Sequence, residues 1–526
     1  MSKKNSAQPQ DPVSDWTGLP ARLAEESTRW SWMWLDGFRM LQHSLLGVTN
    51  YSLDFLLPAS RSVAYLARWE AEKSSQSSLS EIRQSYAGLA MFNAELLRRG
   101  FEGSAETAGD FGAEQMKQLM AAACCGSPGA EGGEDLPAYV RRMANLMETV
   151  SVRYPRAIRE IAPEFGFHFE RGECGERVAE TGRFVLYQVL PNDPEVGVRN
   201  DGKPVLIIPP YVLGADILAF LPGERKSYAH SFANQGVPVY IRVPKDIGEN
   251  EPVQVMTGED DAADTALFCD RIRRRHGRMV TLNGYCQGGF TAVINLLSGE
   301  LDGLVDALIT CVAPIEGTRS PRLGAFLRSM PGRFNDLGLA EKTLPSGNRV
   351  VDGEIMSWLY KIGSIEEGSP AVSMLRDLAM FEMQKQMRPN ISKTAAALNY
   401  WLTCRRHDLP LEVIRLSFES YRTPISEDGT MPVTLFGRRL NLNRIEEMGI
   451  KWLICYGAKD ELVERESALA PRNHVDAEIA EFPKGHVGIA VSWSHPASEC
   501  ALHTRFGEES YRGPVRFQLD LEAGSK

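Results

Sequence analysis

The feature that most constrains this chain is a cysteine set among glycines, between two apolar segments. Residues 282–290 read LNGYCQGGF and contain the pattern G-x-C-x-G-G. The preceding residues, 279–282, predict a short buried strand, and residues 290–297 predict an amphipathic helix. A nucleophile on a tight turn between a strand and a helix needs glycines beside it, because larger side chains would not fit. The pattern therefore predicts a nucleophile elbow with Cys286 as the nucleophile.

The place of Cys286 in this pattern also favours its reactive form. The N-terminus of the following helix directs backbone N–H groups and a positive dipole at the sulfur, which stabilises a thiolate. The alternative is that Cys286 is a small buried apolar residue, as many cysteines are, and the chain contains nine of them. Gly289, the strand before the turn and the partner residues described below favour the nucleophile.

The composition is that of a globular protein and argues against several classes. A chain of 526 residues is expected to form more than one domain, and its net charge of −10 argues against a nucleic-acid partner. The cysteines show no C-x-x-C spacing, so no metal site is expected. Residues 1–16 lack the apolar core of a signal peptide, and no run of about 18 apolar residues occurs. We therefore expect no transmembrane segment and a cytoplasmic location.

Changes in periodicity divide the chain into four parts. Residues 1–15 are predicted to be disordered. Residues 16–165 are predicted to form a helical N-terminal region, in which Pro58 ends one helix and separates it from the next. Residues 166–505 are predicted to form a catalytic domain, and residues 506–526 a C-terminal tail.

The helical N-terminal region carries a row of large apolar side chains. Trp30, Trp34, Phe38 and Leu41 follow one another at spacings of four, four and three residues, which places them on one face of a helix. Apolar stripes at helical spacing usually face a core, so we expect a helix bundle packed on the catalytic domain. A surface that meets a partner is the alternative.

Apolar runs in the remainder of the chain alternate with helical patterns. Strands are predicted at residues 183–190, 205–208, 237–241, 279–282, 304–312, 451–457 and 479–482. Continuous apolar runs are typical of buried parallel strands, and their alternation with helices predicts a doubly wound parallel α/β sheet. The interval 315–443 is too long for one crossover connection. We expect it to form a mostly helical cap over the catalytic edge of the sheet.

A cysteine nucleophile needs a base, and the base needs an acid that orients it. In such a sheet the chain order is nucleophile, acid, histidine, and the acid follows the end of a strand. Asp460 follows the strand at 451–457, and His486 lies on a glycine-containing loop after the next strand. We therefore predict that Asp460 and His486 complete a triad with the cysteine. Glu461 is the alternative acid, and His495 the alternative base.

An oxyanion hole requires two backbone N–H groups that face the developing negative charge. One is expected from Gln287, the residue directly after the nucleophile. The other is expected from Tyr211 or Val212, in the loop that follows the strand at 205–208.

Several motifs of this chain occur together in one known family. They are the elbow (Gly284, Cys286, Gly288 and Gly289), the acid segment 460–463, the base segment 485–487, the strand end 207–212, the acidic pair within 258–261, and the cap segments 399–401 and 409–410. With these motifs the chain resembles the polyhydroxyalkanoate (PHA) synthases, the cysteine-dependent polymerases of bacterial storage polyester. The resemblance covers about residues 183–490, and it is specific at the elbow and triad and loose in the cap.

This resemblance implies an α/β-hydrolase fold with a helical cap insertion and a helical N-terminal region. It implies an acyltransferase that polymerises (R)-3-hydroxyacyl coenzyme A through a covalent acyl-cysteine, with Trp401 in substrate binding. No cofactor is expected, because the coenzyme A thioester is itself the substrate. A homodimer or a partner subunit, and a location at the surface of a polyester granule, are further expectations.

The chain also departs from the usual family pattern. The segments after Trp401 (402–404), after Asp460 (461–465) and after His486 (491–496) differ from it. These changes leave the nucleophile chemistry intact and leave the acyl specificity open. A thioesterase or depolymerase on the same scaffold, and a non-catalytic granule-associated protein, are therefore the alternatives.

Overall fold

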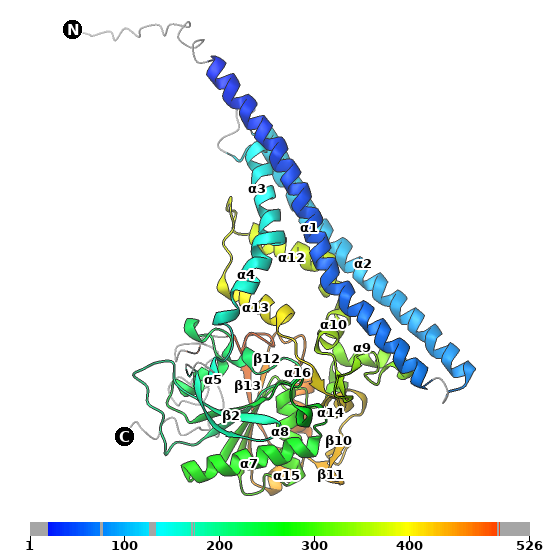
Figure 1. Cartoon of the computed structure of the whole chain (residues 1–526), viewed down its shortest axis with the longest axis vertical. Coiled ribbons are helices and arrows are strands. Elements are labelled where there is room, and N and C mark those ends of the chain that lie inside the picture. Colours follow the sequence, from blue (N-terminus) through cyan, green and yellow to red (C-terminus); the bar gives the residue numbers. More distant parts are fainter. Residues whose placement is uncertain are drawn as a thin grey trace, which may run out of the picture. The chain divides into compact units, whose positions relative to one another are not determined.

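The computed structural model describes residues 19–73, 77–125, 133–169, 172, 174–491 and 494 (Figure 1). The N-terminus predicted to be disordered, the predicted C-terminal tail and the alternative base His495 lie outside these ranges. The chain divides into two compact units. The helical unit comprises residues 1–54, 100–157 and 366–391, and the sheet unit comprises residues 55–99, 158–365 and 392–526.

The sheet unit is built on an eight-stranded sheet with the order β1-β2-β4-β3-β5-β6-β12-β13. Its strands are β1 (Gly175–Glu180), β2 (Phe184–Val189), β3 (Val205–Ile208), β4 (Val239–Pro244), β5 (Val280–Tyr285), β6 (Val305–Cys311), β12 (Lys451–Gly457) and β13 (Glu478–Phe482). Strand β2 runs antiparallel to both of its neighbours, and every other neighbouring pair in this sheet is parallel. This strand order, with one antiparallel strand near an edge, is that of the α/β-hydrolase fold and confirms the predicted fold class.

The centre of the sheet is the most deeply buried part of this unit. Every residue of β5 is buried, and so is every residue of helix α8 (Gln287–Ser298), which follows it. Helix α7 (Gly258–His276) packs beside α8 on the sheet (Figure 1). Parallel strands are stable only when helices cover both of their faces, which explains why these strands are continuous apolar runs. The loops that leave the carboxyl ends of β3, β5, β12 and β13 therefore meet at one edge.

A long insertion separates β6 from β12. Its helices are α9 (Leu323–Ser329), α10 (Gly353–Gly363), α11 (Ile365–Gly368), α12 (Pro370–Glu382), α13 (Lys393–Cys404), α14 (Leu411–Arg422) and α15 (Arg444–Glu447). Its short strands are β7 (Glu341–Thr343), β8 (Arg349–Val351), β9 (Leu409–Pro410), β10 (Thr430–Leu435) and β11 (Arg438–Asn441). The insertion is mostly helical, and its residues 366–391 belong to the helical unit. We call the part that belongs to the sheet unit the cap.

The N-terminal helices are longer than the sequence predicts. Helix α1 runs from Leu19 to Lys73 without interruption, so the expectation that Pro58 ends a helix was wrong. Proline removes one backbone hydrogen bond from a helix interior and clashes with the preceding turn. Here its ring is buried, so packing offsets part of that cost. Helix α2 follows, from Leu79 to Cys124.

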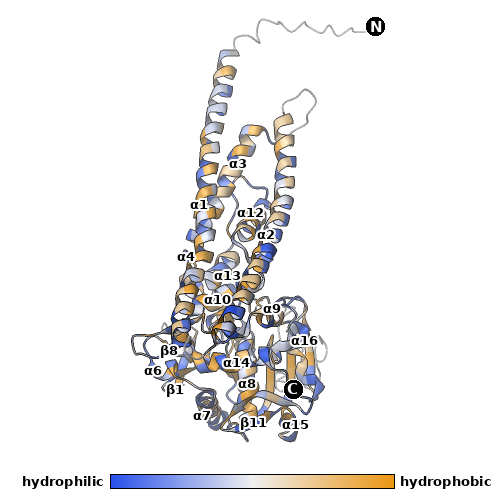
Figure 2. Cartoon of the chain, turned by 90° about the vertical axis from the view of Figure 1, so that its right-hand side faces the viewer, coloured by the Kyte–Doolittle hydropathy of each residue, from blue (hydrophilic) through white to orange (hydrophobic). Residues whose placement is uncertain are grey.

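The row of large apolar side chains on α1 does not face a core. Trp34 is 68% exposed and Phe38 is 71% exposed, and Trp30 and Leu41 are exposed as well. The prediction that this face packs in a bundle was therefore wrong. Figure 2 shows hydrophobic residues along both α1 and α2. None of the helices in the described part of the chain is long and apolar enough to cross a membrane.

The opposite face of α1 packs within the helical unit and is polar. Asp36 is buried and accepts hydrogen bonds from Arg39, at 2.8 Å, and Arg141, at 3.1 Å. Arg142 of helix α3 (Leu136–Glu148) donates to both carboxylate oxygens of Glu382 on α12, at 2.7 and 2.8 Å. These ion pairs add to the apolar contacts of the helical unit, such as the edge-on ring contact between Tyr154 and Phe381.

Candidate active site

The nucleophile candidate lies at the junction of β5 and α8. Cys286 is buried and has φ of +52° and ψ of −127°, a conformation that costs a non-glycine residue about 1–3 kcal/mol. Its amide donates to the carbonyl of Cys311 at 2.8 Å, and its carbonyl accepts from the amide of Gly289 at 2.8 Å. The neighbouring strand and the first turn of the helix therefore hold this strained conformation. It is the geometry of a nucleophile elbow.

Three glycines make room for the elbow. A Cβ at Gly284 would overlap the backbone of the helix turn at Gly288, and a Cβ at Gly289 would overlap the side chain of Ala313. A Cβ at Gly288 would overlap the carbonyl oxygen of Ile208 at the end of β3. The glycines of the sequence motif are thus required by close approach of neighbouring atoms, which are backbone atoms at Gly284 and Gly288 and a side chain at Gly289.

The structure brings Asp460 and His486 together. His486 Nδ1 donates to Asp460 Oδ2 at 2.9 Å, and both residues are buried. The other carboxylate oxygen, Oδ1, accepts from the amides of Leu462 at 3.0 Å and Val463 at 2.9 Å. These backbone bonds fix the carboxylate, and the carboxylate fixes the imidazole with its Nε2 atom unprotonated when the ring is neutral.

The alternative acid, Glu461, lies elsewhere. Its side chain is exposed and forms an ion pair with Arg322 at 3.2 Å. The backbone after β12 therefore directs one carboxylate inward and the next one to solvent. Of the two neighbouring acids, only Asp460 contacts the histidine in the described structure.

The electrostatic environment of His486 couples it to the cysteine. Burial alone would lower the pKa of His486. The charges of Cys286 and Asp460, and hydrogen-bond interactions with both, outweigh burial and raise this pKa to about 10. His486 Nε2 has no regular hydrogen-bond partner among the described residues. The arrangement therefore favours the protonated form of His486 beside Cys286.

Tyr285 is a site residue that the sequence analysis missed. Its hydroxyl donates to the backbone carbonyl of His486 at 2.6 Å, and both groups are buried. The residue before the nucleophile thus anchors the loop that carries the base. A buried tyrosine needs a partner for its hydroxyl, so its position before Cys286 was the available signal.

The predicted oxyanion residues lie on both sides of the elbow. Gln287 is the first residue of α8, and the amide of Val212 faces it, donating to Gln287 Oε1 at 3.2 Å. The side-chain hydroxyl of Tyr211 bonds to the buried carboxylate of Asp261, and the role predicted for its backbone amide stays a prediction. Trp401, the predicted substrate-binding residue, is buried and donates from Nε1 to the carbonyl of Leu213 at 3.0 Å. Trp401 therefore supports the loop that follows β3 and contains Tyr211, Val212 and Leu213, and it does not line the cavity described below. We call this segment the oxyanion loop, after the role that the sequence predicts for it.

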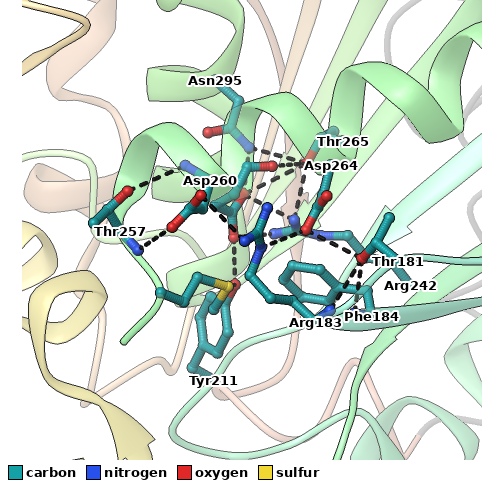
Figure 3. A network of polar contacts seen from close by, with 12 residues as sticks. Thr181, Arg183, Phe184, Tyr211, Arg242, Thr257, Asp260, Asp264, Thr265 and Asn295 are labelled. Carbon is teal, nitrogen blue, oxygen red and sulfur yellow. Dashed lines mark hydrogen bonds and ion pairs between the residues drawn. The ribbon is translucent and has the colours of Figure 1, made fainter. Parts of the chain in front are cut away.

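A fully buried polar network holds the oxyanion loop from beneath (Figure 3). Arg242 on β4 donates to both oxygens of Asp261 on α7, each at 2.8 Å. Asn295 on α8 donates to the same carboxylate at 2.6 Å, and Tyr211 of the loop donates to it as well. One carboxylate thus joins β4, α7, α8 and the loop that contains Val212. Removing one partner from such a network leaves a buried charge uncompensated.

A small apolar cavity lies over Cys286, with a volume of about 40 Å³. Its walls come from the oxyanion loop, the elbow, the cap and the loop after β12: Val212, Leu213, Cys286, Gln287, Phe290, Pro314, Tyr360, Ile414, Ser417, Phe418, Ser420, Tyr421, Leu462 and Val463. A water molecule needs about 10–15 Å³ of such space, so the cavity has room for a few water molecules and not for an acyl thioester. The cap is closed over the nucleophile.

Among the described residues, no group of three or more histidine, cysteine, aspartate or glutamate side chains is placed to hold a metal ion.

No protein-family model matches the chain, and no curated protein sequence matches it. The chain is similar to the solved structure of Est1E from Butyrivibrio proteoclasticus, with 13% identity over 61% of this chain and 92% of that chain and a TM-score of 0.29. It is also similar to a soluble variant of monoglyceride lipase from Saccharomyces cerevisiae, with 12% identity over 60% of this chain and 89% of that chain and a TM-score of 0.36. A third is a thermostable carboxyl esterase from Bacillus coagulans, with 11% identity over 57% of this chain and 85% of that chain and a TM-score of 0.31. At this level of similarity they do not assign an activity to the chain. The strand order and the elbow define it as a protein of the α/β-hydrolase fold with cysteine at the nucleophile position.

Proposed function

We propose that the protein is a cysteine-dependent acyltransferase of the PHA-synthase type, which takes acyl groups from (R)-3-hydroxyacyl coenzyme A thioesters. The observation that carries this proposal is a buried cysteine at a strained elbow, coupled to a histidine that a buried aspartate orients. The substrate class rests on the sequence motifs that the chain shares with the PHA synthases.

In the proposed reaction, His486 Nε2 holds the proton of the Cys286 thiol before the attack, because the raised pKa of His486 favours its protonated form. An ordinary cysteine, with a pKa of about 8.5, is mostly protonated at neutral pH and needs such a base. The thiolate attacks the thioester carbonyl, and the amides of Val212 and Gln287 donate to the oxyanion. The C–S bond to coenzyme A then breaks, the imidazolium returns a proton to the leaving thiolate, and an acyl-cysteine remains.

The second half of the proposed reaction transfers the acyl group to a hydroxyl. His486 removes the proton from the 3-hydroxyl of another acyl unit, and the resulting oxygen nucleophile attacks the acyl-cysteine. An ester forms, and the Cys286 thiol is restored. Exchange of one thioester for another is nearly balanced in free energy, so the acyl group stays activated until the hydroxyl arrives.

The closed apolar cavity supports transfer over hydrolysis. Water in the cavity would convert the acyl-cysteine to a free acid, and a cap that keeps water away protects it. A thioesterase is nevertheless the second candidate, because it would use the same acyl-cysteine with water as the acceptor.

The deciding experiment is incubation of the purified protein with (R)-3-hydroxybutyryl coenzyme A and longer homologues. Release of free thiol would be followed, and the acyl product analysed. We expect thiol release with insoluble polyester, lost in Cys286→Ala and His486→Ala. Thiol release with only free hydroxy acid would make the protein a thioesterase. No thiol release with any acyl length would contradict the proposal and favour a non-catalytic role.

We further propose that a second copy of the chain covers the exposed face of α1. Trp34, Phe38, Leu41, Leu45 and Val48 are all exposed and follow one another at spacings of four, three, four and three. This period of 3.5 residues is the pattern of a two-helix seam, and the five side chains carry no charge that would oppose self-association. A heptad seam of this kind fits another helix better than a flat surface.

A further inference from the structure

The side chain of Gln287 joins two parts of the sheet unit that must separate when a substrate binds. Its Oε1 atom accepts from the amide of Val212 at 3.2 Å, and its Nε2 atom donates to Ser417 Oγ at 2.8 Å. Gln287 lies at the elbow and is buried, whereas Ser417 lies on α14 of the cap. One amide group therefore connects the oxyanion loop, the elbow and the cap.

The orientation of this amide follows from its neighbours. A backbone N–H can only donate, so the oxygen of Gln287 must face Val212. Ser417 donates its own hydroxyl proton to the carbonyl of Val413 at 3.3 Å, which leaves its oxygen free to accept from the Gln287 nitrogen. The two hydrogen bonds are thus compatible only in the observed orientation.

The hydrogen bond from Val212 to Gln287 is incompatible with binding of a substrate carbonyl at the same amide. The amide of Val212 is the donor that the proposed mechanism assigns to the substrate's carbonyl oxygen, and Gln287 Oε1 already uses it. The cavity beside it has a volume of only about 40 Å³. A thioester therefore cannot reach Cys286 with its carbonyl bound until both groups move.

We propose that Gln287 is a latch: its side chain keeps the resting site closed by occupying the oxyanion position and by tying α14 to the elbow. A substrate carbonyl replaces Gln287 Oε1 on Val212, and the same movement releases Ser417 and the cap. Opening of the cap and exposure of the oxyanion donor are then one event. The role of the Val212 amide as an oxyanion donor rests on the proposed acyl transfer. Closure of the cap by the two hydrogen bonds of Gln287 does not depend on that function.

The latch is tested by the rate at which iodoacetamide alkylates Cys286, measured by mass spectrometry of the peptide that contains it. Alkylation requires an open site and a thiol, and it requires no acyl transfer. The exposed Cys124 and Cys404 serve as internal references for reagent reactivity in the same sample. Since a closed site reacts only in its open fraction, the rate reports how often the cap opens.

We expect Ser417→Ala to raise this rate about fivefold, the ratio that corresponds to loss of one hydrogen bond. Gln287→Ala removes both bonds and is expected to raise it about twentyfold, while its backbone N–H is kept. Gln287→Asn, one methylene shorter, cannot reach both partners and is expected to behave like one of these variants. Their ratios to the wild type should be the same at pH 7 and pH 8, because opening involves no proton.

Ser420→Ala is the matched control. Ser420 lies on the same helix, lines the same cavity and donates only to the carbonyl of Ser417 within α14. Its truncation enlarges the cavity equally and leaves Gln287 bound, so the alkylation rate should stay within twofold of the wild type. Unchanged rates in both Ser417→Ala and Gln287→Ala, or equal acceleration in Ser420→Ala, would overturn the latch. Faster alkylation in a protein that processes no acyl thioester would uphold the latch and remove only the proposed function.

Discussion

The interior of the sheet unit and the long helices α1 and α2 place the same kinds of residue in opposite environments. Phe268 of α7 is fully buried, whereas Phe101 of α2 is 75% exposed. A Cβ at Gly284 or Gly288 of the elbow would overlap backbone atoms, whereas a Cβ at Gly112 of α2 would have open space around it. Burial around the elbow is decided within one compact unit. On the helices, apolar periodicity exists without a covering partner in the described chain, so it predicts the helix and not its burial.

The largest difference is expected in chemistry and concerns two neighbouring carboxylates of the sheet unit. Asp460→Asn changes one atom but leaves His486 without a charged partner, and an acyl-transfer rate about 10³–10⁴-fold lower is expected. Glu461→Gln alters an exposed ion pair and should stay within twofold. Steady-state thiol release measures both. Equal losses in the two variants would contradict the assignment of Asp460 as the acid.

The next difference concerns two phenylalanines. Phe268→Ala should lower the free energy of unfolding by about 3–5 kcal/mol, because it opens a cavity in the packed interior. Phe101→Ala should change it by less than about 0.5 kcal/mol, since its ring is already in water. Urea unfolding followed by tryptophan fluorescence and circular dichroism compares the two. A large effect in Phe101→Ala would show that a partner covers α2 in solution.

The third comparison concerns the effect on stability of replacing a glycine at the elbow and a glycine on α2 by alanine. Gly288→Ala should cost about 3 kcal/mol, because the new methyl group would overlap the carbonyl oxygen of Ile208. Gly112→Ala has free space in a helix interior and should stabilise the protein by about 0.5–1 kcal/mol. The melting temperatures of the two variants should therefore move in opposite directions. Movement in the same direction would contradict the close approach at the elbow.

A smaller effect is expected from titration of the buried base. The pKa of His486 is raised from 6.5 to about 10 in the folded protein. A group with a raised pKa stabilises the fold fully below its unfolded pKa and loses that contribution as pH rises through its folded pKa. Stability should therefore fall between about pH 6.5 and 10. Melting temperatures across this window should fall less in His486→Gln than in the wild type, and identical profiles would contradict the raised pKa.

The smallest change in stability is expected on α1, where the effect should be on association. Phe38→Ser should convert a dimer to a monomer in sedimentation velocity at micromolar concentration, with the folding of each chain unchanged. Leu53→Ser, on the same helix, is the control, because Leu53 is exposed but lies outside the heptad positions. A monomeric wild type, or equal dissociation of both variants, would rule out a second copy on this face.

The sequence predicts the bounds of strands in the sheet unit well where a continuous apolar run marks the strand. The strands at 205–208 and 451–457 agree with β3 and β12 at every residue. Their apolar runs are bounded by turn residues, so periodicity alone locates them. Strand β1 was missed, because it lies at the sheet edge and half of its residues are polar. The close approach of Asp460 and His486 was predictable from chain order, and their catalytic roles stay predictions.

Other features depend on contacts that no local pattern records. The bond from Tyr285 to the loop of His486 joins residues about 200 positions apart, and the bonds of Gln287 join three separate segments. Pro58 lies within α1 because its buried ring is packed, which the propensity of proline does not reveal. The exposure of Trp34 depends on the absence of a covering element in the described chain, which helical spacing cannot report.

The complete burial of β5 and α8 has a consequence for the timescales of the site. Amide protons in fully buried central elements exchange with solvent only when a large part of the structure opens, whereas peripheral elements open more easily. Cys286 lies between the strand and the helix that should exchange most slowly. Cys286 should therefore keep its position while the site opens and closes. Local opening of α14, where amide hydrogen exchange is expected to be faster than in β5 and α8, should set the rate at which a substrate reaches it.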